Sequence, residues 1–238
     1  MFLKRKIVVI TALLIAICII AVVTSVNHTS LPTSAKPSQK PQIILDAGHG
    51  GFDGGAVAND GTIEKDINLK ITISLKDLLI QNGYEVIMTR QDDSSTDNAD
   101  AYKTATRKKS DLSNRLKLMD AYPQAIFVSI HLNKFTTSAA SGSQVFYSGN
   151  SPDSKQIGDL IQSSIIRLIQ PQNKRVNKKA TSSTYLLHNA TIPAVLVECG
   201  FLSNNNDLQN LKNAEYQRNM AFSIFCGINE YFMITKEL

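Results

Sequence analysis

Short runs of apolar residues alternate with amphipathic helical patterns along most of this chain. The first apolar run, 43–45, is typical of a buried strand, and apolar residues at helical spacing then predict a helix over 64–82, which Gly83 would end. The same alternation continues to the C-terminus. It predicts strands over 84–89, 125–130, 143–147 (an edge or return strand), 185–187 and 194–197, and helices over 111–122, 157–169 and 216–232.

This alternation predicts an α/β fold with a mixed, mostly parallel central sheet flanked by helices. We expect a single catalytic domain from residue 42 to residue 238, a length that one domain can fill. Ligands of such sheets bind at the carboxyl ends of the strands, so the site is expected at that edge. The polar segment 91–109 is interpreted as a loop.

The N-terminus has a different pattern. Residues 7–26 carry no charge and follow a basic cluster, 4–6, which is typical of a membrane helix with a cytoplasmic N-terminus. The alternative is a cleaved signal peptide, whose apolar core usually has only about 7–15 residues. We therefore expect residues 1–26 to form a membrane anchor or signal segment. Residues 27–41, rich in Ser, Thr, Pro and Lys, are expected to form a flexible linker to a domain outside the cytoplasm.

Charge and cysteine content narrow the choice of partners. The net charge is +5, with basic clusters at 103–109 and 174–179. Such clusters are usually solvated loops, and attraction to an anionic polymer of the cell wall is the functional alternative. Nucleic acid is not expected, because no binding motif accompanies the charge. The three cysteines indicate no disulfide framework, and Cys199 is expected to fill a strand end and not to act as a nucleophile.

Three chemically active side chains stand directly after predicted strands. His49 follows the first strand, His131 follows the strand over 125–130, and Glu198 follows the last strand. Glu64 begins the helix that would pack beside them. Two histidines and a carboxylate are the usual protein ligands of a hydrolytic zinc site, and a further glutamate would carry the proton. The sequence therefore predicts a zinc hydrolase.

Each of these residues also has an ordinary interpretation when it is taken alone. A lone histidine is more often structural, so His28 and His188 are interpreted in that way, although a substrate role for His188 stays open. Glu64 could simply stabilise the start of a helix through the helix dipole. Glu198 could pair with a cation. The glycines around His49 form no phosphate-binding motif and alone indicate only a tight turn.

Taken together, four sequence blocks resemble the zinc-dependent N-acetylmuramoyl-L-alanine amidases of amidase type 3. The blocks are Leu45-Asp46-Ala47-Gly48-His49-Gly50-Gly51-Phe52-Asp53-Gly54-Gly55-Ala56, Glu64 with Asn68-Leu69, Ser129-Ile130-His131-Leu132-Asn133, and Pro193-Ala194-Val195-Leu196-Val197-Glu198-Cys199-Gly200-Phe201-Leu202-Ser203-Asn204. All four occur in the order of the family, and the resemblance covers residues 42–232. It implies that His49, Glu64 and His131 bind zinc and that Glu198 is the catalytic carboxylate.

The resemblance also implies the reaction. The enzyme would hydrolyse the amide between N-acetylmuramic acid and the L-alanine of the stem peptide in peptidoglycan. Glu198 would take a proton from water and return it to the leaving amine. Asp46 or Asn133 could orient the ligands. Arg115 matches a position that is often basic in the family, and we expect it to be structural.

Within the family, a bare domain behind an N-terminal anchor most resembles the germination-specific amidases of spore-forming bacteria. Those enzymes act on spore cortex and, with a deacetylase, make the precursor of muramic-δ-lactam. The interval between His131 and Glu198 must already hold two strands and a helix, whereas division amidases with a regulatory helix carry a longer insert there. We therefore expect that no helix of this chain blocks the site. The alternatives are a vegetative autolysin or cell-separation amidase, another zinc amidohydrolase, peptidase or deacetylase of the cell wall, and a non-catalytic wall-binding module. The need for an accessory activating protein is left open.

Overall fold

The computed structural model describes residues 40–98 and 103–236. The chain from Lys40 onward forms one compact unit. The predicted anchor or signal segment, 1–26, and nearly all of the predicted linker lie outside the described residues. None of the helices in the described ranges combines the length and the apolar character needed to cross a bilayer.

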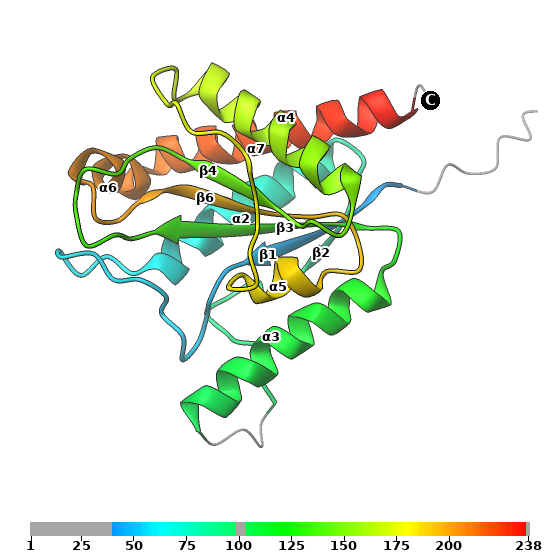
Figure 1. Ribbon diagram of the computed structural model, residues 1–238, viewed down its shortest axis with the longest axis horizontal. Helices are drawn as coiled ribbons and strands as arrows, with labels where there is room; N and C mark the ends of the chain where they lie inside the picture. Colours follow the sequence, from blue (N-terminus) through cyan, green and yellow to red (C-terminus); the bar gives the residue numbers. More distant parts are fainter. Residues whose placement is uncertain (1–39, 99–102, 237–238) are drawn as a thin grey trace, which may run out of the picture. The chain divides into compact units, whose positions relative to one another are not determined.

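Within the described residues, a six-stranded sheet forms the centre of this unit (Figure 1). Its strands are β1 (Gln42–Ala47), β2 (Glu85–Met88), β3 (Ile126–Asn133), β4 (Gln144–Tyr147), β5 (Lys178–Lys179) and β6 (Ala194–Phe201), arranged in the order β2-β1-β3-β6-β4-β5. Strands β2, β1, β3 and β6 are parallel, whereas β4 runs antiparallel to β6 and pairs in parallel with β5. The predicted α/β fold with a mixed, mostly parallel sheet is confirmed.

Helices cover both faces of the sheet (Figure 1). One face carries α2 (Glu64–Gln81), α4 (Pro152–Leu168) and α7 (Ala214–Lys236), and the other carries α3 (Thr104–Ala121) and the short α5 (Tyr185–Asn189). Helix α6 (Asn205–Lys212) packs beside β6 and α7. Successive residues of the central strands therefore enter two different cores, so Val128 packs in the larger one and Phe127 in the smaller one.

One predicted strand, 185–187, is helix α5. Leu186 and Leu187 are both buried, whereas neighbouring residues of a strand point to opposite faces of a sheet. A short helix laid on the sheet brings both leucines into the smaller core with Ile44 and Phe127. The apolar run was correctly recognised as core, but its burial on one side required a helix.

The polar segment predicted to be a loop, 91–109, becomes helical where α3 begins. Its basic residues are good helix formers, and Arg107 pairs with Asp97 at 2.7 Å. The first basic cluster therefore lies on a helix, and the second includes the short strand β5. Helix α6 was not predicted. Its start is capped by Asn204, whose side chain accepts a hydrogen bond from the Asp207 amide at 3.1 Å.

Candidate metal centre

The loop after β1 presents the first histidine. His49 has a positive φ of 63°, and Gly50 follows with a φ of 133°, so the chain turns sharply in a conformation that favours glycine. A side chain at Gly48 would collide with the ring of His131, because a Cβ there would lie 2.3 Å from it. The glycines therefore let the His49 loop lie directly against β3.

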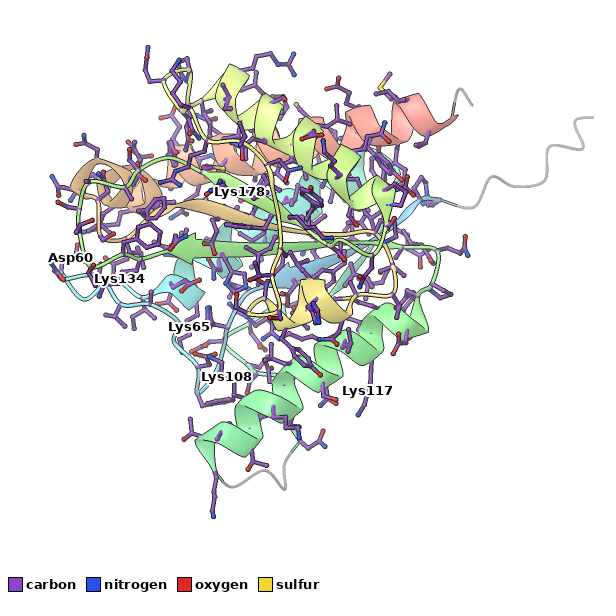
Figure 2. The ribbon with its side chains drawn as sticks, viewed as in Figure 1. Asp60, Lys65, Lys108, Lys117, Lys134 and Lys178 are labelled. Atoms are coloured by element: carbon purple, nitrogen blue, oxygen red, sulfur yellow. The ribbon has the colours of Figure 1, made fainter. Side chains whose placement is uncertain are left out.

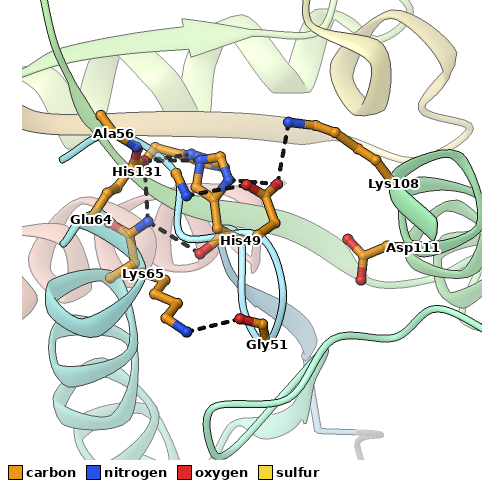
Figure 3. A network of polar contacts seen from close by, with 12 residues as sticks. His49, Gly51, Ala56, Glu64, Lys65, Lys108, Asp111 and His131 are labelled. Carbon is orange, nitrogen blue, oxygen red and sulfur yellow. Dashed lines mark hydrogen bonds and ion pairs between the residues drawn. The ribbon is translucent and has the colours of Figure 1, made fainter. Parts of the chain in front are cut away.

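The three predicted zinc ligands lie together, as Figure 3 shows. Nε2 of His49 is 3.2 Å from Oε1 of Glu64, and Nδ1 of His131 is 3.1 Å from the same oxygen. In a tetrahedral zinc site, neighbouring nitrogen and oxygen ligands are about 3.3 Å apart, because each bond is about 2 Å long. The donor set and its spacing therefore fit a zinc ion held by three protein ligands.

The carboxylate of Glu64 is fixed at the start of α2. It is only 3% exposed. Its Oε2 accepts a hydrogen bond from the Ala56 amide at 2.8 Å, and its Oε1 accepts from the Leu132 amide at 3.0 Å and from Nδ2 of Asn68 at 3.3 Å. Burial raises the pKa of Glu64, but the two neighbouring histidines outweigh burial and hold this pKa well below its usual range. The group is thus an ionised carboxylate, as a metal ligand must be.

His49 is oriented by its second ring nitrogen. Nδ1 of His49 bonds to Asp53 at 2.9 Å, and Lys108 approaches the same carboxylate oxygen at 3.2 Å (Figure 3). Burial lowers the pKa of His49, but the hydrogen bonds with Asp53 and Glu64 raise it to about 9. A carboxylate partner on the far nitrogen is the usual way to orient a metal-binding histidine.

Glu198 lies beside the cluster in β6, where it is the register partner of His131. Both residues were expected just after their strands, but β3 and β6 continue through them, so the sheet sets their positions. Oε2 of Glu198 is buried and has no hydrogen-bond partner among the described residues. Burial raises the pKa of Glu198 to about 7, with His131 lowering and Glu64 raising it. Such a carboxyl group can take up and release a proton near neutral pH.

Two buried arginines hold the backbone of the His49 loop. Nη2 of Arg115 donates to the His49 carbonyl at 2.8 Å, and Nη1 donates to the Ala47 carbonyl at 3.1 Å. Nε of Arg90 donates to the Ala47 carbonyl at 2.8 Å, and its Nη2 donates to the Gly48 carbonyl at 3.1 Å. All three successive carbonyls thus accept hydrogen bonds from a guanidinium, which restrains the loop.

Asp46 lies behind these arginines and not beside the ligands. It accepts hydrogen bonds from Arg115, from Ser129 Oγ at 2.5 Å and from Thr89 Oγ1 at 2.8 Å. Burial raises the pKa of Asp46, but Arg115 and the hydroxyl groups together hold it below its usual value. Asp46 therefore fixes Arg115, which also bonds Asp111 at 2.9 Å, and it has no direct hydrogen bond to a predicted ligand.

Other candidates lie outside the cluster. Asn133 ends β3, where its carbonyl accepts a hydrogen bond from the Leu202 amide at 2.8 Å. His188 is exposed on α5 and does not join the potential ligands, and His28 is outside the described residues. Cys199 is completely buried in β6, and burial raises the pKa of its thiol well above the usual value. A buried, protonated thiol fits packing and not nucleophilic attack.

Sequence reasoning gave no role to Arg90, Asn68 or Asp53. Arg90 had a usable signal, because it follows a predicted strand at the carboxyl edge of the sheet, where sites gather. Asn68 stands one helical turn after Glu64 and therefore on the same face of α2. Asp53 shows no such signal, since its contact with His49 depends on the shape of the loop.

Comparison with known proteins decides the family. The family model described as N-acetylmuramoyl-L-alanine amidase matches residues 43–230. This chain belongs to that family. It is a peptidoglycan amidase, and it is 36% identical over 203 residues to the germination-specific N-acetylmuramoyl-L-alanine amidase of Bacillus subtilis (strain 168), a match that covers 85% of this chain and 82% of the relative.

Solved structures of amidases share the fold. The CwlD amidase from Clostridioides difficile, solved in complex with the GerS lipoprotein, is 42% identical with a TM-score of 0.79, and the match covers 82% of this chain and 100% of that one. The N-acetylmuramoyl-L-alanine amidase AmiC2 of Nostoc punctiforme is 27% identical with a TM-score of 0.70, covering 81% of this chain and 97% of that one.

Proposed function

We propose that this amidase is zinc-dependent, that His49, Glu64 and His131 bind the metal, and that Glu198 transfers the proton. The observation that carries the proposal is the convergence of three ligand atoms within 4.8 Å of one another, beside a glutamate whose buried oxygen has no partner in the described chain. When bound there, zinc would polarise the scissile carbonyl and lower the pKa of water.

Glu198 then performs the proton transfers of the hydrolysis. As a carboxylate, it takes a proton from the attacking water, whose oxygen forms a new bond to the lactyl carbonyl carbon. As the carbon–nitrogen bond breaks, Glu198 returns that proton to the nitrogen of L-alanine. The products are a glycan with a free lactyl carboxylate and a stem peptide with a free amine. A pKa raised to about 7 by burial suits both steps.

The second part of the proposal concerns the biological substrate. Similarity to the germination-specific amidase of Bacillus subtilis and to CwlD of Clostridioides difficile supports a role in spore cortex, where release of the stem peptide prepares muramic-δ-lactam formation. The lipoprotein in the CwlD complex supports an accessory protein for this chain as well. We place the enzyme outside the cytoplasm, with residues 1–26 as its anchor or signal segment.

Mass spectrometry of digested peptidoglycan tests both parts. The purified protein, loaded with zinc, is incubated with spore cortex and with vegetative peptidoglycan, and a chelated sample serves as the control. We expect free stem peptides that begin with L-alanine, only with zinc, and more from cortex. Release of the same peptides after chelation would refute zinc dependence. A clear preference for vegetative peptidoglycan would refute the cortex role.

A further inference from the structure

A cavity of about 610 Å³ lies next to the carboxyl end of β6, and Arg175 is one of its lining residues. Ser141 and Gly142 line one part of it, and Asp207 of α6 lines another. The mechanism proposed above uses none of these residues. A cavity with both polar and apolar lining residues and with two cationic ones, Lys174 and Arg175, can hold further parts of a polymeric substrate near the strand that carries the catalytic glutamate.

The guanidinium of Arg175 is held in one orientation. Its Nε donates to the Ser141 carbonyl at 2.7 Å, and its Nη1 donates to Oε1 of Gln144 at 3.0 Å. The guanidinium carbon also lies 4.5 Å from the centre of the ring of Phe201, which is fully buried. An arginine stacked on an aromatic ring and fixed by two hydrogen bonds loses little further freedom when it binds a ligand.

The remaining nitrogen of Arg175 is available. Nη2 has no hydrogen-bond acceptor within residues 40–98 and 103–236, and the side chain forms no ion pair with a carboxylate there. The acidic residue of the cavity, Asp207, turns its Oδ2 towards the backbone amides of Gly142 and Phe201, at 2.8 Å and 2.9 Å. A fixed guanidinium without a carboxylate partner is suited to bind a carboxylate from a ligand.

Gln144 connects this arginine to the active site. It is the register partner of Glu198 in the antiparallel pair of β4 and β6. Directly opposite residues of such a pair place their side chains on the same face, with Cβ atoms about 5 Å apart. Gln144 is only 5% exposed, so its position is set by packing. Arg175 is therefore hydrogen-bonded to the residue that stands opposite Glu198 in the sheet.

We propose that Arg175 binds a free carboxylate of the stem peptide and thereby selects acidic stems. This inference rests on the proposed function, because it assumes that Glu198 marks the scissile amide. The second residue of the stem peptide, D-isoglutamate, carries such a carboxylate. It lies two residues beyond the bond that is cleaved, which is a reach of about 7 Å for an extended chain. Gln144, which is hydrogen-bonded to Arg175 and stands opposite Glu198 in the sheet, lies on the path that such a stem would follow.

Two synthetic substrates test this subsite. N-acetylmuramoyl-L-alanyl-D-isoglutamyl-L-lysine and N-acetylmuramoyl-L-alanyl-D-isoglutaminyl-L-lysine both have the γ-carboxyl group of the second residue in a peptide bond. They differ only at the α-carboxyl group of that residue, which is a carboxylate in the first (the acid) and an uncharged amide of the same shape in the second (the amide). We expect kcat/KM of the wild type to favour the acid. Arg175→Gln should lower kcat/KM for the acid by about 10- to 100-fold, the loss that follows removal of a charge-assisted hydrogen bond, and should leave hydrolysis of the amide nearly unchanged.

Hydrolysis of the amide substrate at the wild-type rate shows that the Arg175→Gln variant is folded. If that variant unfolds at a lower temperature than wild type, Arg175→Lys takes its place, because it keeps the charge and loses the fork of donors. Lys117→Gln is the matched control for charge, since Lys117 is an exposed residue of α3 (Figure 2). It should leave the ratio of the two kcat/KM values unchanged.

The outcomes separate the two proposals. An equal loss on both substrates, or a wild type with no preference for the acid, would overturn the subsite. A wild type that hydrolyses intact peptidoglycan but neither short substrate would overturn it as well. If the wild type also fails to release stem peptides from intact peptidoglycan, the proposed function itself is wrong, and the subsite falls with it.

Discussion

At the scale of single residues, the two glutamates that neighbour His131 have opposite environments. Glu64 accepts hydrogen bonds from two backbone amides, and its pKa lies well below the usual range. Glu198 has a buried oxygen with no partner among the described residues, and burial raises its pKa to about 7. Environments that separate the pKa values of two carboxyl groups assign different roles to them. The ionised group is suited to bind a cation, and the other is suited to carry a proton.

The first prediction concerns Glu198→Gln. Glutamine has nearly the same shape but cannot accept the proton. We therefore expect kcat/KM to fall by about 10²- to 10⁴-fold, which is the usual contribution of a general acid–base group. The zinc content should stay at the wild-type value. Both are measured on one preparation, by kinetics and by elemental analysis.

Glu215→Gln serves as the matched control, because Glu215 is exposed in the first turn of α7. It should retain full activity. Turnover close to wild type in Glu198→Gln would remove Glu198 from the mechanism.

The second prediction concerns Arg90→Lys. Arg90 is buried and donates to backbone carbonyls of the His49 loop, not to a carboxylate, so lysine keeps the charge but loses the multiple donors. The dissociation constant for zinc should rise about 10- to 100-fold, as is typical when a group that orients metal ligands is lost. Competition with a chelator of known affinity measures it.

A control variant distinguishes the loss of His49-loop positioning from a general loss of stability. Arg167→Lys changes the same residue type at an exposed position in the last turn of α4 and should leave zinc affinity unaltered. An Arg90→Lys protein that binds zinc as tightly as wild type would show that the loop needs no such restraint.

At the scale of elements, His131 and Glu198 lie within strands β3 and β6, whereas the sequence pattern predicts that they follow these strands. The apolar runs correctly located β3 and β6, but both strands extend through His131 and Glu198 to Asn133 and Phe201. His131 and Glu198 interrupt the two apolar runs, so hydropathy ends each strand there, although Leu132 and Cys199 beyond them are buried. Hydrogen bonding between the strands, which no local pattern reports, sets where pairing ends.

The third prediction belongs to helix α6. Asn204 caps its first turn and also donates from Nδ2 to the Ser138 carbonyl at 2.7 Å. Asn204→Ala should lower the free energy of unfolding by about 1 kcal/mol or somewhat more. Denaturant titration measures the change.

Asn206→Ala, at an exposed position inside the same helix, is the comparison. It should be neutral or slightly stabilising, because alanine is the better helix former. Equal stability of the two variants would mean that the cap contributes nothing.

At the scale of the whole molecule, the proposed zinc site joins separate parts of the fold. His49 comes from the loop after β1, Glu64 from the start of α2, and His131 from β3. A ligand that binds only the folded state stabilises it by mass action. Zinc binding should therefore raise the free energy of unfolding of the whole catalytic unit, in addition to its part in catalysis.

The fourth prediction follows from this linkage. At free zinc about a hundredfold above its dissociation constant, chelation should lower the free energy of unfolding by about 2.7 kcal/mol. The thermal midpoint of the wild type should fall accordingly. His49→Ala, which lacks one ligand, should bind little zinc and show almost no shift. An unchanged wild-type midpoint after chelation would contradict zinc binding to the native state.

The sequence by itself determined the α/β fold class, most of the elements, and the four residues now proposed for the site. These follow from hydrophobic periodicity and from short motifs, which are local properties of the chain. The tertiary structure decided that 185–187 is a helix, that β3 and β6 extend through His131 and Glu198, and that Arg90 and Arg115 restrain the His49 loop. Such features depend on contacts between residues far apart in the chain, and only the packed fold specifies which of them meet.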